Sequence, residues 1–303
     1  MSFAATQKLS RIINRLVFYS LLVFKIMPIL SLEDLGPVVM RERAAHAREC
    51  FRDSVWPIYG SKKGTVGKIA RGDLSLVGTG ILISIRDRNY VVTAAHVTDE
   101  LYRSPLWIPR GDDFWPIQGM LHETVPPQGN RRLDVFDCCW VEVSAEDRAR
   151  FRRATFLTTD HLSHNRVPNH NRFLMAYGYP GSKNKKFTSG VIQPRALSYT
   201  GCSPEPHETR EELMGRRTEH IFLHYPRASV ENEEAEHHHP IAPSGMSGGA
   251  LIDLGDFSIP DNSIQSGGAP PLLAGILLEY HRAHEIMVAL NIRFVTDAIE
   301  NTH

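Results

Sequence analysis

After Trp56 the chain consists of short apolar, β-branched runs separated by turns, and this pattern narrows the possible folds more than any other feature. The clearest pair covers residues 80–85 and 90–93, which are joined by the polar turn 86–89. The other expected strands are residues 114–118, 138–143, 173–177, 190–193, 220–224, 250–253 and 272–278. Many short strands and few helices predict an all-β sandwich or barrel.

Helical patterns lie near the two ends of the chain. Residues 32–53 interleave apolar side chains with a charged, arginine-rich face, as an amphipathic helix does. A second amphipathic helix is expected over residues 292–300. The polar stretch 203–239 is expected to be a long surface loop or insertion broken by one strand, and no internal repeat is visible.

The first 30 residues contain an apolar run from Leu16 to Phe24, flanked by Arg15 and Lys25. About nine residues are too few to cross a bilayer as a helix, which needs about 20. A basic region precedes the run, as in a signal peptide, but no small-residue cleavage site follows it. Two interpretations stay open, a packed or interfacial helix and a cryptic signal or anchor. We expect an uncleaved N-terminus and a cytoplasmic protein; the alternative is an N-terminally anchored or exported one.

Charge and cysteine content exclude several classes of protein. Lys plus Arg number 34 and Asp plus Glu number 34, so the net charge is zero and gives no electrostatic reason to expect nucleic-acid binding. Four cysteines, including the adjacent Cys138 and Cys139, are too few for a disulfide scaffold, and we expect free thiols in a reducing compartment. Glu236 and the three histidines that follow it are a weak metal-binding pattern. We expect these side chains to be solvated, with no metal and no cofactor.

The strongest chemical signal is the sequence Gly245-Met246-Ser247-Gly248-Gly249. A serine between glycines is a candidate nucleophile, because glycines permit unusual backbone angles and close approach of a substrate. The backbone amides of Gly245 and Ser247 can converge on one point as an oxyanion hole. By itself the motif is equally compatible with a simple turn.

A histidine and an aspartate can supply the partners that such a serine needs. His96 ends the sequence Thr-Ala-Ala-His directly after the expected strand 90–93, which can hold an imidazole rigidly at a sheet edge. Asp137 directly precedes the expected strand 138–143, where it can accept a hydrogen bond from an imidazole and fix its tautomer. Asp134 competes with it. We favour Asp137 because only it adjoins the strand, and we expect Asp134 to be a solvated turn carboxylate.

Together these motifs resemble those of the chymotrypsin/trypsin-like serine peptidases, and of their bacterial members in particular. That family has the order His, Asp, Ser, with T-A-A-H, an aspartate before an apolar strand, and G-x-S-G-G. The same order occurs here in His96, Asp137 and Ser247, with separations that suit a two-barrel peptidase. The resemblance covers about residues 55–300 and leaves the first 54 residues outside it.

The resemblance implies two six-stranded antiparallel β-barrels with the site in the cleft between them. A helical extension over residues 1–54 would precede a peptidase domain over residues 55–303. Within that domain the two barrel subdomains would cover about residues 55–155 and 156–303.

The resemblance also implies a role for each of the three residues. His96 would be the general base, Asp137 would orient it, and Ser247 would attack the scissile carbonyl to form an acyl-enzyme. The digestive members carry an aspartate before the nucleophile, where this chain has Met246. We expect Met246 to pack inward, so that no N-terminal cleavage is needed to form the site.

The resemblance places the specificity pocket at Ile241, six residues before the serine, and at Leu278, Glu279 and Tyr280. An apolar base at Ile241 argues against cleavage after Lys or Arg. Glu279 in the pocket wall leaves the preference open.

These features favour a serine endopeptidase acting on protein or peptide substrates. Two alternatives stay open: a catalytically silent relative that binds peptides in the same cleft, and a peptidase switched by a regulatory partner that contacts residues 1–54. Membrane association of the N-terminus is not favoured, and no nucleic-acid partner is expected.

Overall fold

The computed structural model describes residues 32–61, 74–102, 105–110, 113–151, 153–163, 172–184, 194–203, 213, 219–226, 241–256 and 270–302. The chain divides into two compact units, Met1–Glu42 and Arg43–His303, and every strand among the described residues lies in the second unit. The expected strand at residues 190–193, the histidines after Glu236 and the apolar N-terminal run lie outside the described residues. Within the described part of the chain, no helix has the length and apolar character that crossing a membrane requires.

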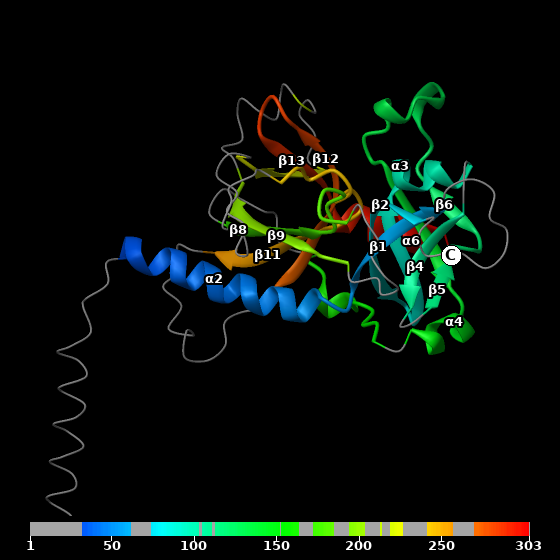
Figure 1. The fold of residues 1–303 in the computed structure, drawn as a ribbon, viewed down its shortest axis with the longest axis horizontal. Coiled ribbons are helices and arrows are strands. Elements are labelled where there is room, and N and C mark those ends of the chain that lie inside the picture. The colour runs from blue at the N-terminus through cyan, green and yellow to red at the C-terminus, as the bar shows by residue number, and fades with distance from the viewer. Residues whose placement is uncertain are drawn as a thin grey trace, which may run out of the picture. The chain divides into compact units, whose positions relative to one another are not determined.

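Two antiparallel sheets make up the second unit (Figure 1). The seven strands of the first sheet are β1 Val55–Ser61, β2 Leu74–Ile85, β3 Arg88–Ala94, β4 Leu106–Arg110, β5 Asp113–Pro116, β6 Leu121–Glu123 and β7 Cys138–Val143, and they lie in the order β5–β4–β1–β2–β3–β7–β6. The six strands of the second sheet are β8 Arg172–Gly178, β9 Leu197–Cys202, β10 His220–His224, β11 Ala250–Asp256, β12 Leu272–His281 and β13 Ile286–Asn291, in the order β10–β13–β12–β11–β8–β9.

The expected fold class is confirmed: the protein is all-β, with two antiparallel sheets and a helix towards each end of the sequence. The first sheet has seven strands where six were expected. The expected strand at residues 114–118 is β5, which forms an antiparallel hairpin with β4.

The hairpin between β2 and β3 shows how local sequence sets the register. Ile85 pairs with Arg88, so only Arg86 and Asp87 form the turn. Both have positive φ angles, 50° and 62°. Two-residue turns of this kind match the right-handed twist of the flanking strands.

Strand β8 of the second sheet is buried on both faces. In β8, Met175 and Tyr177 lie in a hydrophobic core shared with the first sheet, whereas Leu174 and Ala176 lie in a separate core of the second sheet. Successive side chains of a strand point to opposite faces, so a strand covered on both faces reads as a continuous apolar run. The two sheets are therefore joined by a common core.

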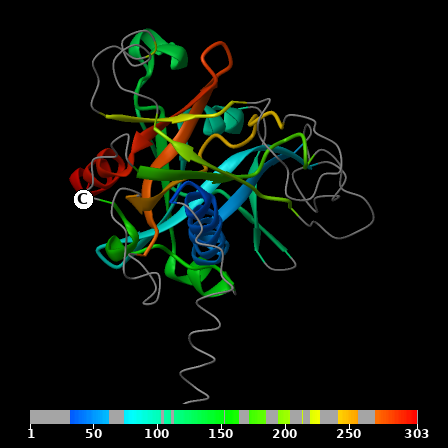
Figure 2. The same ribbon diagram turned by 90° about the vertical axis from the view of Figure 1, so that its left-hand side faces the viewer.

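Two helices pack against this common core. From Arg43 onward, helix α2 (Leu32–Phe51) belongs to the unit that holds the sheets, and its Ala47 and Phe51 are buried in the core. Helix α6 (Ile292–Asn301), red in Figures 1 and 2, follows β13 of the second sheet yet buries its apolar face in the core shared with the first sheet. The end of the chain thus holds the two sheets together.

Candidate active site

The pairing of β3 with β7 brings His96 and Asp137 together. These strands are antiparallel, with Ala94 opposite Cys138. The residues that follow β3 therefore meet the residues that precede β7 at one edge of the sheet. His96 lies in the short helix α3 (Ala95–Thr98), and the Ala95 N–H donates a hydrogen bond to the Asp137 carbonyl at 2.9 Å.

The Asp137 carboxylate holds His96 at two points. His96 Nδ1 lies 2.5 Å from Asp137 Oδ2, and the His96 backbone N–H donates to Oδ1 at 2.8 Å. An ionised carboxylate can only accept hydrogen bonds, so Nδ1 carries the proton and the lone pair of Nε2 is available for a reacting group. The carboxylate side chain is 13% exposed and the imidazole 39%, so the histidine is the more open of the two.

The charge around His96 favours its protonated form. Burial alone lowers the pKa of His96, but the hydrogen bond and the charge of Asp137 raise it, with smaller contributions from Asp99 and Glu279. The net effect is a His96 pKa above its ordinary value of 6.5. An imidazole of this kind is a stronger base than a free one.

The loop of Ser247 presents two backbone amides with no acceptor among the described residues. The Ser244 carbonyl accepts from the Gly181 N–H at 2.7 Å, and the Met246 carbonyl accepts from the Gly249 N–H at 2.8 Å. In a trans peptide the N–H points opposite to the carbonyl. The N–H groups of Gly245 and Ser247 therefore point away from these two anchors, as donors of an oxyanion hole must.

Thr79 of β2 fixes this loop to the first sheet, and sequence reasoning missed it. Its N–H donates to the Ser247 carbonyl and its Oγ1 donates to the Gly245 carbonyl, both at 2.9 Å. Its Oγ1 also accepts from the Tyr179 N–H at 3.1 Å. The available signal was the sequence Gly78-Thr79-Gly80 inside an apolar strand, since glycine in a strand marks close approach of another backbone.

Gly248 shows how closely the loop and the first sheet approach each other. It has a φ of +82°, and a Cβ atom there would lie 2.0 Å from the Thr79 carbonyl oxygen and 2.1 Å from Thr93 Oγ1. Neither the space nor the backbone angle admits another residue. The glycine after Ser247 is thus required by packing between the sheets.

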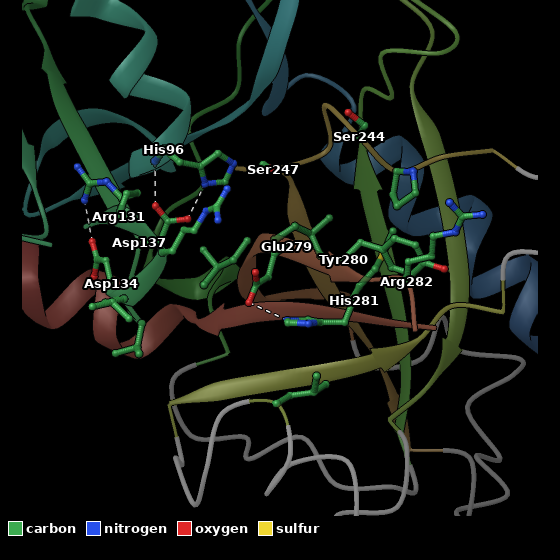
Figure 3. A pocket seen from close by; sticks show the side chains of 18 of the residues that line it. His96, Arg131, Asp134, Asp137, Ser244, Ser247, Glu279, Tyr280, His281 and Arg282 are labelled. Atoms are coloured by element: carbon green, nitrogen blue, oxygen red, sulfur yellow. Dashed lines mark hydrogen bonds and ion pairs between the residues drawn. The ribbon is translucent and has the colours of Figure 1, made fainter. Parts of the chain in front are cut away.

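His96, Asp137 and Ser247 all line one cleft of about 970 Å³. Figure 3 shows the His96 imidazole lying between Asp137 and Ser247. Between these described residues, no hydrogen bond joins Ser247 to His96. Contacts of this type often tighten only when a substrate is bound.

The residues expected in the specificity pocket divide into two groups. Leu278, Glu279 and Tyr280 line the cleft along β12 (Figure 3). Ile241 does not line it; its side chain is buried in the core of the second sheet, and its carbonyl accepts from the Tyr225 hydroxyl at 2.9 Å.

Glu279 forms a hydrogen bond with a histidine at the cleft surface. Its carboxylate lies 2.8 Å from His281 Nε2. That hydrogen bond lowers the pKa of Glu279 against the opposing effect of partial burial. Glu279 is therefore an ionised, already partnered carboxylate.

Asp134 is not the solvated turn carboxylate that the sequence suggested. Its side chain is only 3% exposed, and Oδ2 lies 2.7 Å from Arg131 Nη1. Burial would raise the pKa of Asp134, but hydrogen bonds from Thr124, Arg131 and backbone amides lower it. Asp134 is enclosed by Arg131 and Thr124, and the sequence around it does not reveal these contacts. Asp137, and not Asp134, contacts His96.

The remaining candidates have structural surroundings. Met246 is 2% exposed and lies in the core of the second sheet, so it packs inward as expected. Cys138 and Cys139 are buried, and burial raises the pKa of Cys139 to about 12, so its thiol stays protonated. Among the described residues, no group of three or more His, Cys, Asp and Glu side chains is arranged to hold a metal ion.

Comparison with known proteins gives matches only at the level of solved structures. No protein-family model matches the chain, and no curated protein matches it. A serine endoprotease from Yersinia pestis is 16% identical, with a TM-score of 0.47 over 85% of this chain and 65% of that one. The HtrA-type protease AlgW with a tripeptide is 16% identical, with a TM-score of 0.47 over 85% of this chain and 62% of that one. AlgW with a decapeptide is 15% identical, with a TM-score of 0.47 over 85% of this chain and 67% of that one.

The chain thus spans less than two thirds of the first two of these structures. At this identity and at TM-scores below 0.5, these structures say nothing about the chemistry of the site. That chemistry must be derived from the residues of this chain. The solved structures named here are thus a serine endoprotease and an HtrA-type protease with bound peptides.

Proposed function

We propose that the protein is a serine endopeptidase that hydrolyses peptide bonds through Ser247, His96 and Asp137. The observation that carries this proposal is the Asp137 carboxylate held 2.5 Å from His96 Nδ1, with Ser247 on the opposite side of the imidazole. A serine hydroxyl is a weak nucleophile unless an adjacent base removes its proton. The partly buried aspartate accepts two hydrogen bonds from His96 and so gives that base a fixed orientation.

In the proposed reaction Ser247 Oγ attacks the carbonyl carbon of the scissile bond while His96 Nε2 accepts its proton. Asp137 stabilises the imidazolium that results. The oxyanion of the tetrahedral intermediate accepts hydrogen bonds from the N–H groups of Gly245 and Ser247. His96 then protonates the departing amine as the C–N bond breaks. Water, deprotonated by His96, hydrolyses the acyl-enzyme and releases Ser247.

The direct test is cleavage of a defined substrate. An unfolded protein such as reduced, alkylated casein is incubated with the full chain, and new termini are mapped by mass spectrometry. We expect discrete internal cuts that are absent when Ser247 is replaced by alanine. Identical cleavage by both forms would assign the activity to a contaminant and contradict the proposal.

One observation favours the silent peptide-binding alternative, namely the missing hydrogen bond between Ser247 and His96. If this hydrogen bond is also absent when a peptide is bound, peptides bind in the cleft but Ser247 neither cleaves them nor reacts with a fluorophosphonate. Labelling requires an activated serine, so it separates the two functions.

The pKa of His96 predicts how reactivity depends on pH. The base must be neutral to accept a proton, so the labelling rate should rise as the pH increases through the pKa of His96. Because that pKa lies above 6.5, the half-maximal rate should also fall above pH 6.5. The measurement is the rate constant of fluorophosphonate labelling from about pH 5 to 9. A profile without this rise would show that His96 is not the base, whereas a midpoint below 6.5 would show only that Asp137 does not raise its pKa.

Packing of Met246 predicts that the site forms without cleavage of the N-terminus. Met246 cannot accept a new ammonium group, and the Ser247 loop is held by Thr79 and by hydrogen bonds within the loop. Full-length, uncut protein should therefore label with the fluorophosphonate. Labelling only of chains cut between residues 50 and 80 would contradict this prediction. Residues 1–54 then stay available for docking, for example to a regulatory partner.

A further inference from the structure

Arg131 lies in a cluster of three carboxylates next to the candidate active site. Its side chain is only 16% exposed. Nε and Nη2 donate to the two oxygens of Asp99 at 3.2 and 3.1 Å, Nη2 also donates to Glu123 at 3.1 Å, and Nη1 donates to Asp134 at 2.7 Å. The planar guanidinium group suits this forked contact, which a lysine cannot reproduce. Such a cluster is not an ordinary surface ion pair.

Two of these carboxylates are close in sequence to the His96–Asp137 pair, one to each member. Asp99 lies three residues after His96, and its N–H donates to the Ala95 carbonyl at the end of helix α3. Asp134 lies three residues before Asp137. Arg131 therefore bridges the segment that carries the imidazole to the segment that carries its carboxylate. Figure 3 shows the contact between Arg131 and Asp134.

Asp134 passes this restraint to both sides of Asp137. Its Oδ1 accepts from the Phe136 N–H at 3.2 Å, and its Oδ2 accepts from Thr124 Oγ1 at 2.5 Å. Thr124 Oγ1 accepts in turn from the Cys138 N–H at 3.0 Å. The residues directly before and directly after Asp137 are thus both bonded to the cluster.

Asp137 needs such a restraint because of its backbone conformation. Its φ is +38°, a left-handed angle that costs a non-glycine residue free energy and persists only where the surroundings enforce it. The second sheet contributes as well, since His220 Nε2 of β10 donates to the Val135 carbonyl at 2.6 Å. Without these anchors the segment would relax, and the carboxylate would turn away from His96.

We propose that Arg131 is a positioning residue of the candidate active site, which acts by joining Asp99 to Asp134 and so holds Asp137 against His96. This inference rests on the proposed peptidase function. It predicts that loss of the bridge slows the reaction of Ser247 with a small probe, up to about 100-fold for a displacement near 1 Å. The affinity for a peptide in the cleft should change much less, because Arg131 holds the His96–Asp137 pair and not the substrate.

The bridge also has an electrostatic signature at His96. The charged groups that raise the pKa of His96 are Asp137, Asp99 and Glu279. Removing the Arg131 charge leaves Asp99 and its neighbours uncompensated, so the pKa of His96 should rise. Removing the Asp99 carboxylate should lower it. The two variants are therefore expected to slow labelling while moving the pH midpoint in opposite directions.

The experiment compares Arg131→Lys, Arg131→Met and Asp99→Asn with the wild-type chain. Rates of fluorophosphonate labelling are measured against pH, and circular dichroism and thermal unfolding identify folded variants. Arg131→Met leaves the buried carboxylate of Asp134 without its cation and is the variant at risk of unfolding. Arg131→Lys retains the charge, and Asp99 is 37% exposed, so these two variants decide the test if Arg131→Met does not fold. Arg88→Met is the matched control. Arg88 pairs with Glu142 across β3 and β7, at the end of these strands away from His96.

We expect folded Arg131→Lys and Asp99→Asn proteins to label at least about 10-fold more slowly at the pH plateau, with the midpoint of Asp99→Asn at lower pH. Arg88→Met should label like wild type. Wild-type rates and midpoints in folded Arg131→Lys and Asp99→Asn would overturn the role of Arg131 while leaving the peptidase proposal intact. Failure of the wild-type chain to label would instead overturn the proposed function.

Discussion

Replacing Ser247 with alanine is expected to abolish peptide hydrolysis and fluorophosphonate labelling. The loop would keep its conformation, because its contacts to Thr79 and Leu277 use backbone atoms of Ser247, Gly245 and Gly248. Only the hydroxyl oxygen is lost, and with it the atom that attacks the carbonyl. Removing the nucleophile of a comparable triad lowers turnover by about 10⁶-fold.

The measurement is the rate of appearance of new peptide termini, together with thermal unfolding of both proteins. We expect the melting temperature of Ser247→Ala to stay close to wild type while turnover falls below detection. Ser75→Ala, which removes an exposed hydroxyl from β2, is the control and should retain full turnover. Retention of turnover in Ser247→Ala would remove the proposed nucleophile.

Replacing Asp137 with asparagine is expected to lower the rate by about 10⁴-fold, by analogy with other triads. The asparagine amide can donate a hydrogen bond to Nδ1, which stabilises the tautomer whose proton sits on Nε2. That tautomer cannot accept the Ser247 proton. The charge that raises the pKa of His96 is lost as well, so the residual activity should reach half its maximum at a lower pH than wild type.

Asp134→Asn is the comparison that makes this result specific. Asp134 contacts Arg131 and Thr124 but not His96, so its replacement should affect mainly the free energy of unfolding, with a smaller loss of rate. Kinetic constants and denaturant unfolding are measured for both variants. A larger rate loss in Asp134→Asn than in Asp137→Asn would mean that the wrong carboxylate has been assigned to His96.

The strands that sequence reasoning located are those with uninterrupted apolar, β-branched runs. The expected bounds of β7 and β10 agree with the structure, and the expected helix at residues 32–53 corresponds to α2. Strands β1, β4, β6, β9 and β13 were missed. In β1 and β4, Pro57 and Pro109 interrupt the run, and proline normally argues against a strand because it cannot donate to the ladder. Strand β13 is a short apolar run that periodicity alone cannot assign to strand or helix.

The candidate site was predictable where each residue adjoins a recognisable strand. His96 follows β3 and Asp137 precedes β7, so the pairing of these two strands is enough to bring the side chains together. Thr79 and Arg131 could not be found in the same way. Thr79 bonds to the Ser247 loop, which is distant in sequence, and this contact exists only once the two sheets have packed. Arg131 joins Asp99 to Asp134, and this contact exists only once the fold has brought their two segments together.

The pocket expectation fails at Ile241 for a related reason. The resemblance to the serine peptidases placed its side chain in the pocket. The side chain instead packs with Tyr225, Leu251 and their neighbours inside the second sheet, while Ala242 and Pro243 line the cleft. An apolar side chain packs into the nearest hydrophobic core, and a motif alone does not show where that core lies.

The most direct test is to map the site of a fluorophosphonate adduct on the full-length, uncut chain by mass spectrometry. An activated serine reacts with this probe, and an ordinary surface serine does not. We predict a single adduct on Ser247, formed faster above pH 6.5 and absent from Asp137→Asn on the same timescale. An unmodified Ser247 in folded wild-type protein, or an adduct on another serine, would contradict the account.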